Sequence, residues 1–366
     1  MNPGPVSKAS GQRQFEVVWP PRIVRPSRPP ALVYLDQNHF INLARAVQGT
    51  APLGYDVLLD ACRRSRAESR ALFPLSMTHC FEVASITDPK QRSKVAAVME
   101  ELSDFRYLPG RDIVARLEIE AMLDTLSAPA GLGGEPIPLL GTSMLFAFGN
   151  IGSWVVRNSD GSDADATEFQ DQIDEFTRKL EQRLLAGPAD EDLPALQQLG
   201  YTHQGWRGVS ERRAEQEREQ VERFDAEPKW RKERLRDAIA VRELTIEWME
   251  AITAALMARG TSIGQVIGDQ QRIRRFTEGM PSICVAVSLK ARYHSNPQHR
   301  WTVNDIHDID AMAVAVPYCD AVFTDSAVKS SLDRSPELRV FNTFVPRRPT
   351  DLANWLDGRT ADGVGS

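Results

Sequence analysis

Two short apolar segments at opposite ends of the chain each run into an aspartate, and this pattern constrains the fold more than any other. Residues 32–36 read Leu-Val-Tyr-Leu-Asp, and residues 320–325 read Asp-Ala-Val-Phe-Thr-Asp. Such runs are typical of buried strands in an α/β sheet, where ligands bind at the carboxyl ends of the strands. Asp36 and Asp325 would repel each other at one edge unless a cation lay between them, and a divalent cation with oxygen ligands is the usual solution. The pattern therefore predicts a metal-dependent enzyme.

The composition is that of an ordinary globular protein. The chain has 366 residues, of which 42% are hydrophobic and 26% charged, so one large domain or two smaller ones would fit. We find no window of eighteen apolar residues and no signal-peptide pattern, and expect a cytoplasmic protein that makes no membrane contact. The formal charge of −6 argues against a protein that coats nucleic acid nonspecifically.

The order of patterns along the chain predicts an α/β fold with a large helical insertion. Residues 1–30 are rich in Pro and Arg, which indicates a disordered arm. Strand and helix patterns alternate over 31–126, with strands expected near 31–35, 71–75 and 105–108. Residues 127–279 look mostly helical. Residues 280–345 return to the α/β pattern, with a last strand at 338–341, and 346–366 form a tail.

Two features of the helical middle bear on its role. Residues 205–243 mix acidic and basic side chains almost evenly, which favours a solvated helix over a nucleic-acid surface. Residues 158–165 and 187–192 are polar or rich in Gly and Pro, so we expect proteases to cut there first. We predict a helical subdomain that controls access to the acidic edge or binds a partner.

Each candidate acid also has a plain structural explanation. Asp36 and Asp325 would suit helix N-caps, and Glu82 alone would be an ordinary solvated residue. Asp305, Asp308 and Asp310 could all match a helix dipole. We favour a catalytic role for these acids. Otherwise Asp36, Glu82, the acids at 305–310 and Asp325 would each need a separate structural explanation, although the topology brings all of them to one edge of the sheet.

The ordered set of residues resembles the PIN-domain nucleases. The set comprises a strand followed by Asp36, a helix with Glu82 after an apolar strand, Asp308 followed by alanines at 311, 313 and 315, and Asp320-x-x-x-Thr324-Asp325. The likeness covers 31–126 and 280–345. It implies a parallel sheet of about five strands flanked by helices, and an acidic pocket that holds Mg²⁺ or Mn²⁺ and cuts single-stranded RNA.

The resemblance also implies roles for individual residues. Asp36, Glu82, Asp308 and Asp325 would be the metal ligands and catalytic residues, and Asn38, Thr324, Ser326 and Asp305 would support them or contact substrate. Many members have Thr-x-Asp after the fourth strand, whereas here Asp325 follows Thr324 directly, so Asp320 and Asp305 are alternatives for that ligand. Strand geometry favours Asp325, because a residue five positions earlier lies near the opposite edge of the sheet.

Side chains near these acids in sequence give further hypotheses about substrate binding. Cationic residues that could form an RNA groove are Arg272, Arg274, Arg275, Lys290, Arg292 and Arg300, and rings that could stack on bases are Tyr293, His294 and Trp301. For His39, His79 and His307 we expect packing or capping rather than acid-base chemistry.

Two alternative functions stay open at this point. A catalytically silent PIN-like module would bind RNA or a protein through the helical middle, for instance an antitoxin-like inhibitor or a second copy of the chain. A haloacid-dehalogenase-type phosphohydrolase would also place an aspartate after the first strand, but residues 36–40 read Asp-Gln-Asn-His-Phe and offer no second Asp as general acid.

Overall fold

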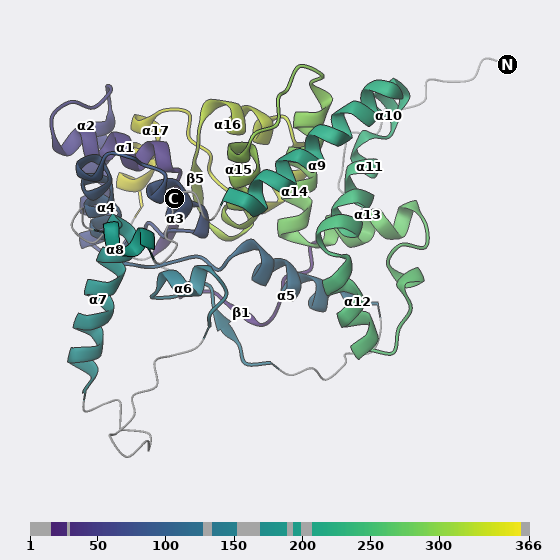
Figure 1. The fold of residues 1–366 in the computed structure, drawn as a ribbon, viewed down its shortest axis with the longest axis horizontal. Coiled ribbons are helices and arrows are strands. Elements are labelled where there is room, and N and C mark those ends of the chain that lie inside the picture. The colour runs from purple at the N-terminus through teal and green to yellow at the C-terminus, as the bar shows by residue number, and fades with distance from the viewer. Residues whose placement is uncertain are drawn as a thin grey trace.

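The computed structural model describes residues 16–27, 30–126, 134–151, 169–188, 193–198 and 207–359. Helices make up most of these residues and surround a small parallel sheet (Figure 1). The N-terminal helices are α1 (Gln37–Val47), α2 (Tyr55–Ala67), α3 (Met77–Ala84), α4 (Pro89–Ser103), α5 (Arg111–Asp124) and α6 (Met144–Ala147). The middle contains α7 (Gln170–Ala186), α8 (Leu193–Gln198), α9 (Arg207–Ala226), α10 (Pro228–Glu233), α11 (Leu235–Arg242), the π-helix η2 (Glu243–Glu247), α12 (Met249–Ala258), η3 (Ile263–Gln265) and α13 (Gln270–Gly279). The C-terminal part contains α14 (Pro281–Ser295), α15 (Val303–Tyr318), α16 (Ser326–Asp333), η4 (Pro336–Phe341) and α17 (Pro349–Asp357).

The central sheet has three parallel strands in the order β3 (Ala71–Leu72), β2 (Ala31–Leu35) and β5 (Ala321–Phe323). The α/β class is therefore confirmed. Single bridges extend the pairing at both sides, from Leu75 to Tyr107 and from Ala321 to Phe344. The strand expected at 105–108 is reduced to this one bridge at Tyr107, so the described residues form three regular strands here rather than five.

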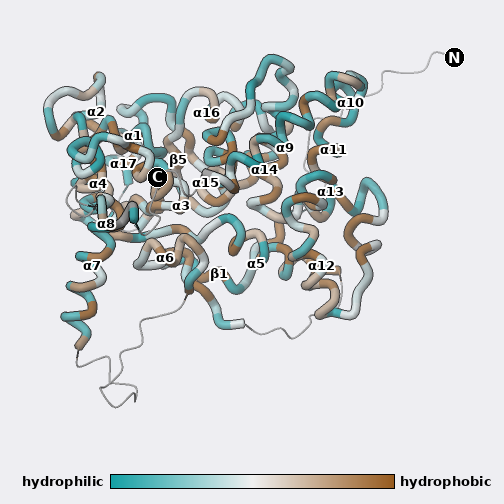
Figure 2. The backbone as a smooth tube through the Cα atoms, in the orientation of Figure 1, coloured by the Kyte–Doolittle hydropathy of each residue, from teal (hydrophilic) through white to brown (hydrophobic). Residues whose placement is uncertain are grey.

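The alternation of side chains in β2 explains why the sheet is covered on both faces. Val33 and Leu35 belong to one cluster of buried residues, which α1, α2 and α4 complete, whereas Leu32 and Tyr34 belong to a second cluster with α14 and α15. All five residues of β2 are buried, as expected of a strand between two helical layers. Figure 2 shows the apolar positions concentrated along α14 and α15 at the centre, and polar positions along α9 and α10 at the edge.

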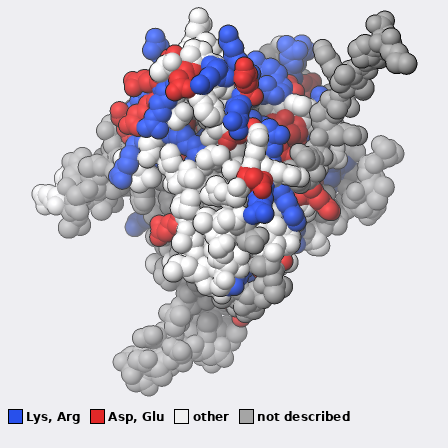
Figure 3. Space-filling model, turned by 90° about the vertical axis from the view of Figure 1, so that its right-hand side faces the viewer, with Lys and Arg blue, Asp and Glu red and all other residues white. Residues whose placement is uncertain are grey.

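The helical middle shares a third core with the rest of the protein. Ile252, Phe276 and Leu244 pack in one buried cluster with Ile119 of α5 and Ile283 of α14. The helical character expected for this region is confirmed in its described part, whereas residues 158–165 and 189–192 lie outside the described residues. Figure 3 shows basic and acidic side chains interspersed on the upper part of the face that it presents, above a largely uncharged region. The expectation of a solvated helix over 205–243 holds only in part, because Glu217 and Glu243 are 2% and 1% exposed.

Part of the predicted N-terminal arm is packed, and the prediction of disorder is wrong for residues 16–27. Val18 N donates to Gly279 O at 2.8 Å, and Trp19 packs edge-on against Tyr318. Residues Ile23–Val24 form β1, which pairs in parallel with β4 (Ile137–Pro138). Proline-rich composition lowers the helical and strand propensity of this segment, but the ring of Trp19 and a two-residue ladder anchor it.

Two predictions for the C-terminal part are also wrong. Residues 338–341 form the end of the 3₁₀ helix η4 instead of a strand, because Pro336 suits the first turn of a helix and Leu338 and Phe341 are spaced three apart, which places both on one face. The predicted tail contains α17, whose Leu352 and Leu356 are buried beside α2. Burial of these leucines explains why the segment is ordered.

Candidate functional site

Asp36 and Asp325 lie at the same edge of the sheet, as the sequence predicts. In the ladder between β2 and β5, Leu35 is the partner of Phe323, and Asp36 N donates to Phe323 O at 2.9 Å. The two strands therefore end side by side, and Asp36 and Thr324-Asp325 follow them. This register places both carboxylates at the carboxyl edge, where α/β sheets bind ligands.

Both aspartates also cap a helix, so the structural role expected for them, that of an N-cap, is present. Asp36 Oδ1 accepts a hydrogen bond from Gln37 N at 2.8 Å at the start of α1. Asp325 Oδ1 accepts from Ala327 N at 2.6 Å and from Val328 N at 2.8 Å at the start of α16. Because both caps are made through Oδ1, capping fixes the orientation of each carboxylate without using its whole binding capacity.

Asp320 lies at the other end of the same strand. Its Oδ2 accepts a hydrogen bond from Leu32 N at 2.9 Å, near the amino end of β2. The prediction that Asp325, and not Asp320, shares an edge with Asp36 is confirmed.

Asp308 lies on α15, beyond the first turn of that helix. The capping box is made by Thr302 and Asp305, whose carboxylate accepts from Thr302 N at 2.7 Å. Since Asp308 lies three residues further along, the dipole explanation does not account for it. Asp305 also pairs with His299 at 3.2 Å, so its carboxylate is used structurally and the idea that it replaces Asp325 loses support.

The pKa values indicate that four candidate acids share one electrostatic environment. Burial and the negative charges of Asp36, Asp325 and Asp305 raise the pKa of Asp308 to about 8. Burial, and then the charge of Asp325, raises the pKa of Asp36 to about 6. Glu82 on α3 has its pKa raised by burial, then by Asp36 and Asp308. Burial makes the larger contribution and the like charges add to it, so the negative charge of these acids is poorly stabilised by its surroundings.

The donor set suits a hard divalent cation in its chemistry. Carboxylate oxygens are the preferred protein ligands of Mg²⁺ and Mn²⁺, and a cation would remove the repulsion that raises these pKa values. In their present positions, no three His, Cys, Asp or Glu side chains among the described residues are grouped closely enough to hold a metal ion. The acids therefore influence one another's pKa values but do not form a complete coordination sphere.

Buried polar groups without a hydrogen-bond partner adjoin the two aspartates. Thr324 is 4% exposed, and its Oγ1 has no partner. Gln37 is 7% exposed, and neither atom of its side-chain amide has a partner. Unsatisfied buried groups are costly, and at this edge they are suited to contacts with a ligand or its water. Thr324 was expected from the sequence, whereas Gln37 was not, although a glutamine on the buried side of a helix start is a signal for such a role.

Two other residues that were expected to support the acids or contact substrate also lie at this edge. Asn38 and Ser326 are exposed in the first turns of α1 and α16. Both lie within two residues of a candidate acid and are accessible from solvent. Their expected contact with substrate stays a prediction.

The three histidines near the acids have structural partners. His39 stacks on Phe323 with a ring separation of 3.5 Å, and His79 Nε2 donates to Leu35 O at 2.7 Å. Burial lowers the pKa of both to about 4, so neither carries a positive charge at neutral pH. His307 Nε2 lies 3.1 Å from Ser210 Oγ of α9. Packing, as expected from the sequence, accounts for all three.

Several residues expected to bind RNA are buried instead. Tyr293, His294 and Trp301 are at most 8% exposed and pack on one another, so their faces are not open to nucleobases. Lys290 is 2% exposed and pairs with three glutamates, whereas Arg274 pairs with Asp237 but its side chain remains 44% exposed. The sequence pattern could not distinguish an exposed cation from one neutralised within the core.

Comparison of the chain with protein-family models, curated proteins and solved structures gives no match. The likeness to PIN-domain nucleases therefore rests on the residues and geometry above. None of the helices in the described part of the chain is both long and apolar enough to cross a membrane.

Proposed function

We propose that this protein is a divalent-metal-dependent endoribonuclease that hydrolyses single-stranded RNA at the edge formed by β2 and β5. The observation that carries the proposal is the shared field of Asp36, Glu82, Asp308 and Asp325. These acids come from four separate elements, and burial, followed by the charge of at least one other member of the set, raises the pKa of Asp36, Glu82 and Asp308. Strongly perturbed carboxylates at a sheet edge are more typical of an active site than of a scaffold.

The sheet supports the same proposal. Its strand order, with β2 between β3 and β5 and bridges outward to Tyr107 and Phe344, is compatible with the five-stranded PIN arrangement. We infer that Tyr107 and Phe344 mark the fourth and fifth strands. Each consists of a single bridge, and Tyr107 also forms an antiparallel bridge to Gly141, which is a departure from an all-parallel sheet.

Each candidate acid has a task in the proposed reaction. Asp36, oriented by its cap on α1, would hold the cation together with Asp308 and Asp325, and Glu82 would orient the attacking water. The bound cation would activate water, neutralise phosphate charge and stabilise the leaving oxygen. Thr324 Oγ1 and the Gln37 amide would hydrogen-bond to the phosphate or to water in the pocket. Hydrolysis would leave a 5′-phosphate and a 3′-hydroxyl.

The absence of a close triad among the described residues gives the silent-module alternative its support. A module that had lost its chemistry would retain the fold and the acids without bringing them together. The two functions differ in a simple test, since the silent module binds RNA or a partner but leaves RNA intact.

The test is cleavage of an end-labelled, unstructured RNA with Mn²⁺, with Mg²⁺ and with EDTA. We expect products with 5′-phosphate ends that appear with either metal and disappear with EDTA. Asp36→Asn is the matched variant, because Asn also caps helices and so removes only the charge. Asp320→Asn is its control, at the opposite end of the same strands. Intact RNA under all conditions would refute the nuclease proposal and favour the silent module.

A further inference from the structure

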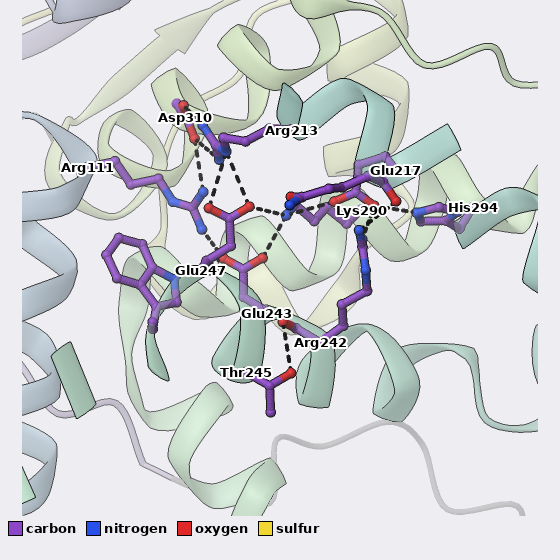
Figure 4. A network of polar contacts seen from close by, with 12 residues as sticks. Arg111, Arg213, Glu217, Arg242, Glu243, Thr245, Glu247, Lys290, His294 and Asp310 are labelled. Atoms are coloured by element: carbon purple, nitrogen blue, oxygen red, sulfur yellow. Dashed lines mark hydrogen bonds and ion pairs between the residues drawn. The ribbon is translucent and has the colours of Figure 1, made fainter. Parts of the chain in front are cut away.

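A buried ionic network joins the helical middle to α15, the helix that carries Asp308 (Figure 4). Its members are Arg111 (α5), Arg213 and Glu217 (α9), Arg242 (α11), Glu243 and Glu247 (η2), Lys290 (α14) and Asp310 (α15). The network contains as many acids as bases, so its charges balance within the protein. Most of it is shielded from solvent, with Glu243 at 1% and Lys290 at 2% exposure.

Asp310 is the residue of α15 that forms ion pairs with this network. Arg213 forms a bidentate pair with Asp310, with Nη1 to Oδ2 at 2.6 Å and Nη2 to Oδ1 at 2.9 Å. Arg111 Nη1 donates to the same carboxylate at 2.9 Å. Two planar guanidinium groups thus fix one carboxylate, which gives geometric definition as well as attraction.

The two arginines are themselves held in place by η2. Arg111 Nη2 pairs with Glu243, and Arg213 Nε lies 3.2 Å from a carboxylate oxygen of Glu247. Lys290 Nζ lies 2.8 Å from Glu243 and 3.3 Å from Glu247. The arginines therefore have little freedom to follow Asp310 if α15 moves.

A second contact between α9 and α15 lies one turn away from the first. Ser210 Oγ is 3.1 Å from His307 Nε2, and Ser210 precedes Arg213 on α9 by three residues, as His307 precedes Asp310 on α15. Residues three apart share one face of a helix. One face of α9 thus holds one face of α15 at two successive points, on either side of Asp308 in sequence.

These contacts restrain the rotation of α15 about its axis, together with the packing of α15 on α14 in the apolar core. Asp308 does not share the face of His307 and Asp310, so it points elsewhere while its neighbours are held. A side-chain group lies roughly 5 to 6 Å from a helix axis, so a rotation of about 10° displaces it by about 1 Å. A displacement of that size in a catalytic group can cost about 100-fold in rate.

Ionic residues are a poor choice for stability alone at such a place. A well-packed apolar cluster of similar volume is often as stable as a buried ionic one, whereas directional pairs can specify a single arrangement. The network is therefore better explained by placement than by stability. The network contacts α15 at Asp310, two residues from Asp308.

We propose that Arg213 and Arg111, through Asp310, are positioning residues that orient α15 so that Asp308 can join Asp36 in binding the cation. This inference rests on the proposed function and deepens it. It gives the helical middle a role in completing the metal site, besides the control of access or partner binding expected from the sequence.

The test compares the affinity of the full-length protein for Mn²⁺, measured by calorimetry without RNA, in wild type, Arg213→Met and Arg212→Met. Arg212 is the neighbouring arginine on α9 and is exposed, so its variant is a matched control. Loss of an outer contact to a metal ligand typically costs 10- to 100-fold in metal affinity, and because Arg213 acts on Asp308 one step further out, through Asp310, the lower end of that range applies. We expect a loss of about that size in Arg213→Met and wild-type affinity in Arg212→Met.

Two further measurements separate placement from general loss of structure. Amide hydrogen exchange in metal-free Arg213→Met should increase over residues 303–318 and stay unchanged in β2. Excess Mn²⁺ should restore kcat for RNA cleavage in this variant without changing KM for RNA. Arg213→Lys keeps the positive charge but loses the bidentate guanidinium contact, so it should bind Mn²⁺ with intermediate affinity. This variant also serves as the test if Arg213→Met does not fold.

The outcomes distinguish the inference from the proposed function. Folded Arg213→Met or Arg213→Lys with wild-type Mn²⁺ affinity would overturn the inference and leave the nuclease proposal standing. Wild-type protein that binds no Mn²⁺ would overturn both. An equal loss of affinity in Arg212→Met would also contradict the inference, since the effect would not depend on the grip on Asp310.

Discussion

Replacement of Asp308 by Asn should stabilise the metal-free protein at neutral pH. Asp308 has a pKa of about 8 in the folded protein against 3.8 as its ordinary value, owing to burial and to its acidic neighbours. The folded protein therefore holds this proton more tightly than the unfolded chain. The resulting stabilisation is fully present below about pH 4 and is lost as the pH rises towards 8.

The size of the effect follows from the shift in pKa. One pKa unit corresponds to about 1.4 kcal/mol, so ionisation of Asp308 costs at most about 4 kcal/mol of folding free energy at pH 7 and about 2 kcal/mol at pH 5. Asn resembles the protonated acid in shape and carries no charge, so Asp308→Asn avoids this cost. At about 2 °C per kcal/mol, its Tm should exceed that of wild type by up to about 8 °C at pH 7 and by half of that at pH 5.

Thermal melts in EDTA at pH 5, 6 and 7 measure this difference. Melts with Mn²⁺ serve as the control, because the cation should stabilise wild type more than Asp308→Asn and narrow the gap. If Asp308→Asn is less stable than wild type, by an amount that does not change with pH, then Asp308 has a structural role and the charge argument is refuted.

The remaining predictions concern the edge and the core. Asp36→Asn should reduce metal-dependent RNA cleavage at least 100-fold with an unchanged circular dichroism spectrum, whereas Asp320→Asn should retain wild-type kcat/KM; equal activity of both variants would remove Asp36 from the site. Leu356→Ala should lower the free energy of unfolding by about 2 to 5 kcal/mol, because Leu356 is fully buried in the core beside α2. A decrease below about 1 kcal/mol in denaturant titration would mean that α17 is only loosely attached. Tyr34→Phe removes hydroxyl contacts with Ser76 and Thr78 and should cost about 1 kcal/mol without changing Mn²⁺ affinity by calorimetry; a tenfold loss of affinity would instead place Tyr34 within the metal site.

The sequence predicted best those elements whose signals are local. The strand expected near 31–35 is β2, and α4 begins at Pro89 with Asp88 as its cap, because apolar runs and capping chemistry act within a few residues. The edge with Asp36 and Asp325 was predicted because a parallel sheet brings the ends of its strands together. The same logic correctly separated Asp325 from Asp320.

Features that depend on distant contacts were not predicted. The order of residues 16–27 depends on β4 and Tyr318, and that of α17 depends on α2. The burial of Lys290 depends on acids from α9 and η2. These partners lie far away in sequence, and no local pattern identifies them.

The most direct test of the central claim is a crystal structure with Mn²⁺, using the anomalous scattering of the metal. We expect an anomalous peak between Asp36 and Asp308, with carboxylate oxygens about 2.0 to 2.6 Å from the ion and Asp325 or Glu82 drawn towards it. A structure at saturating Mn²⁺ with no peak at the edge of β2 and β5, or with the metal bound only elsewhere, would contradict it.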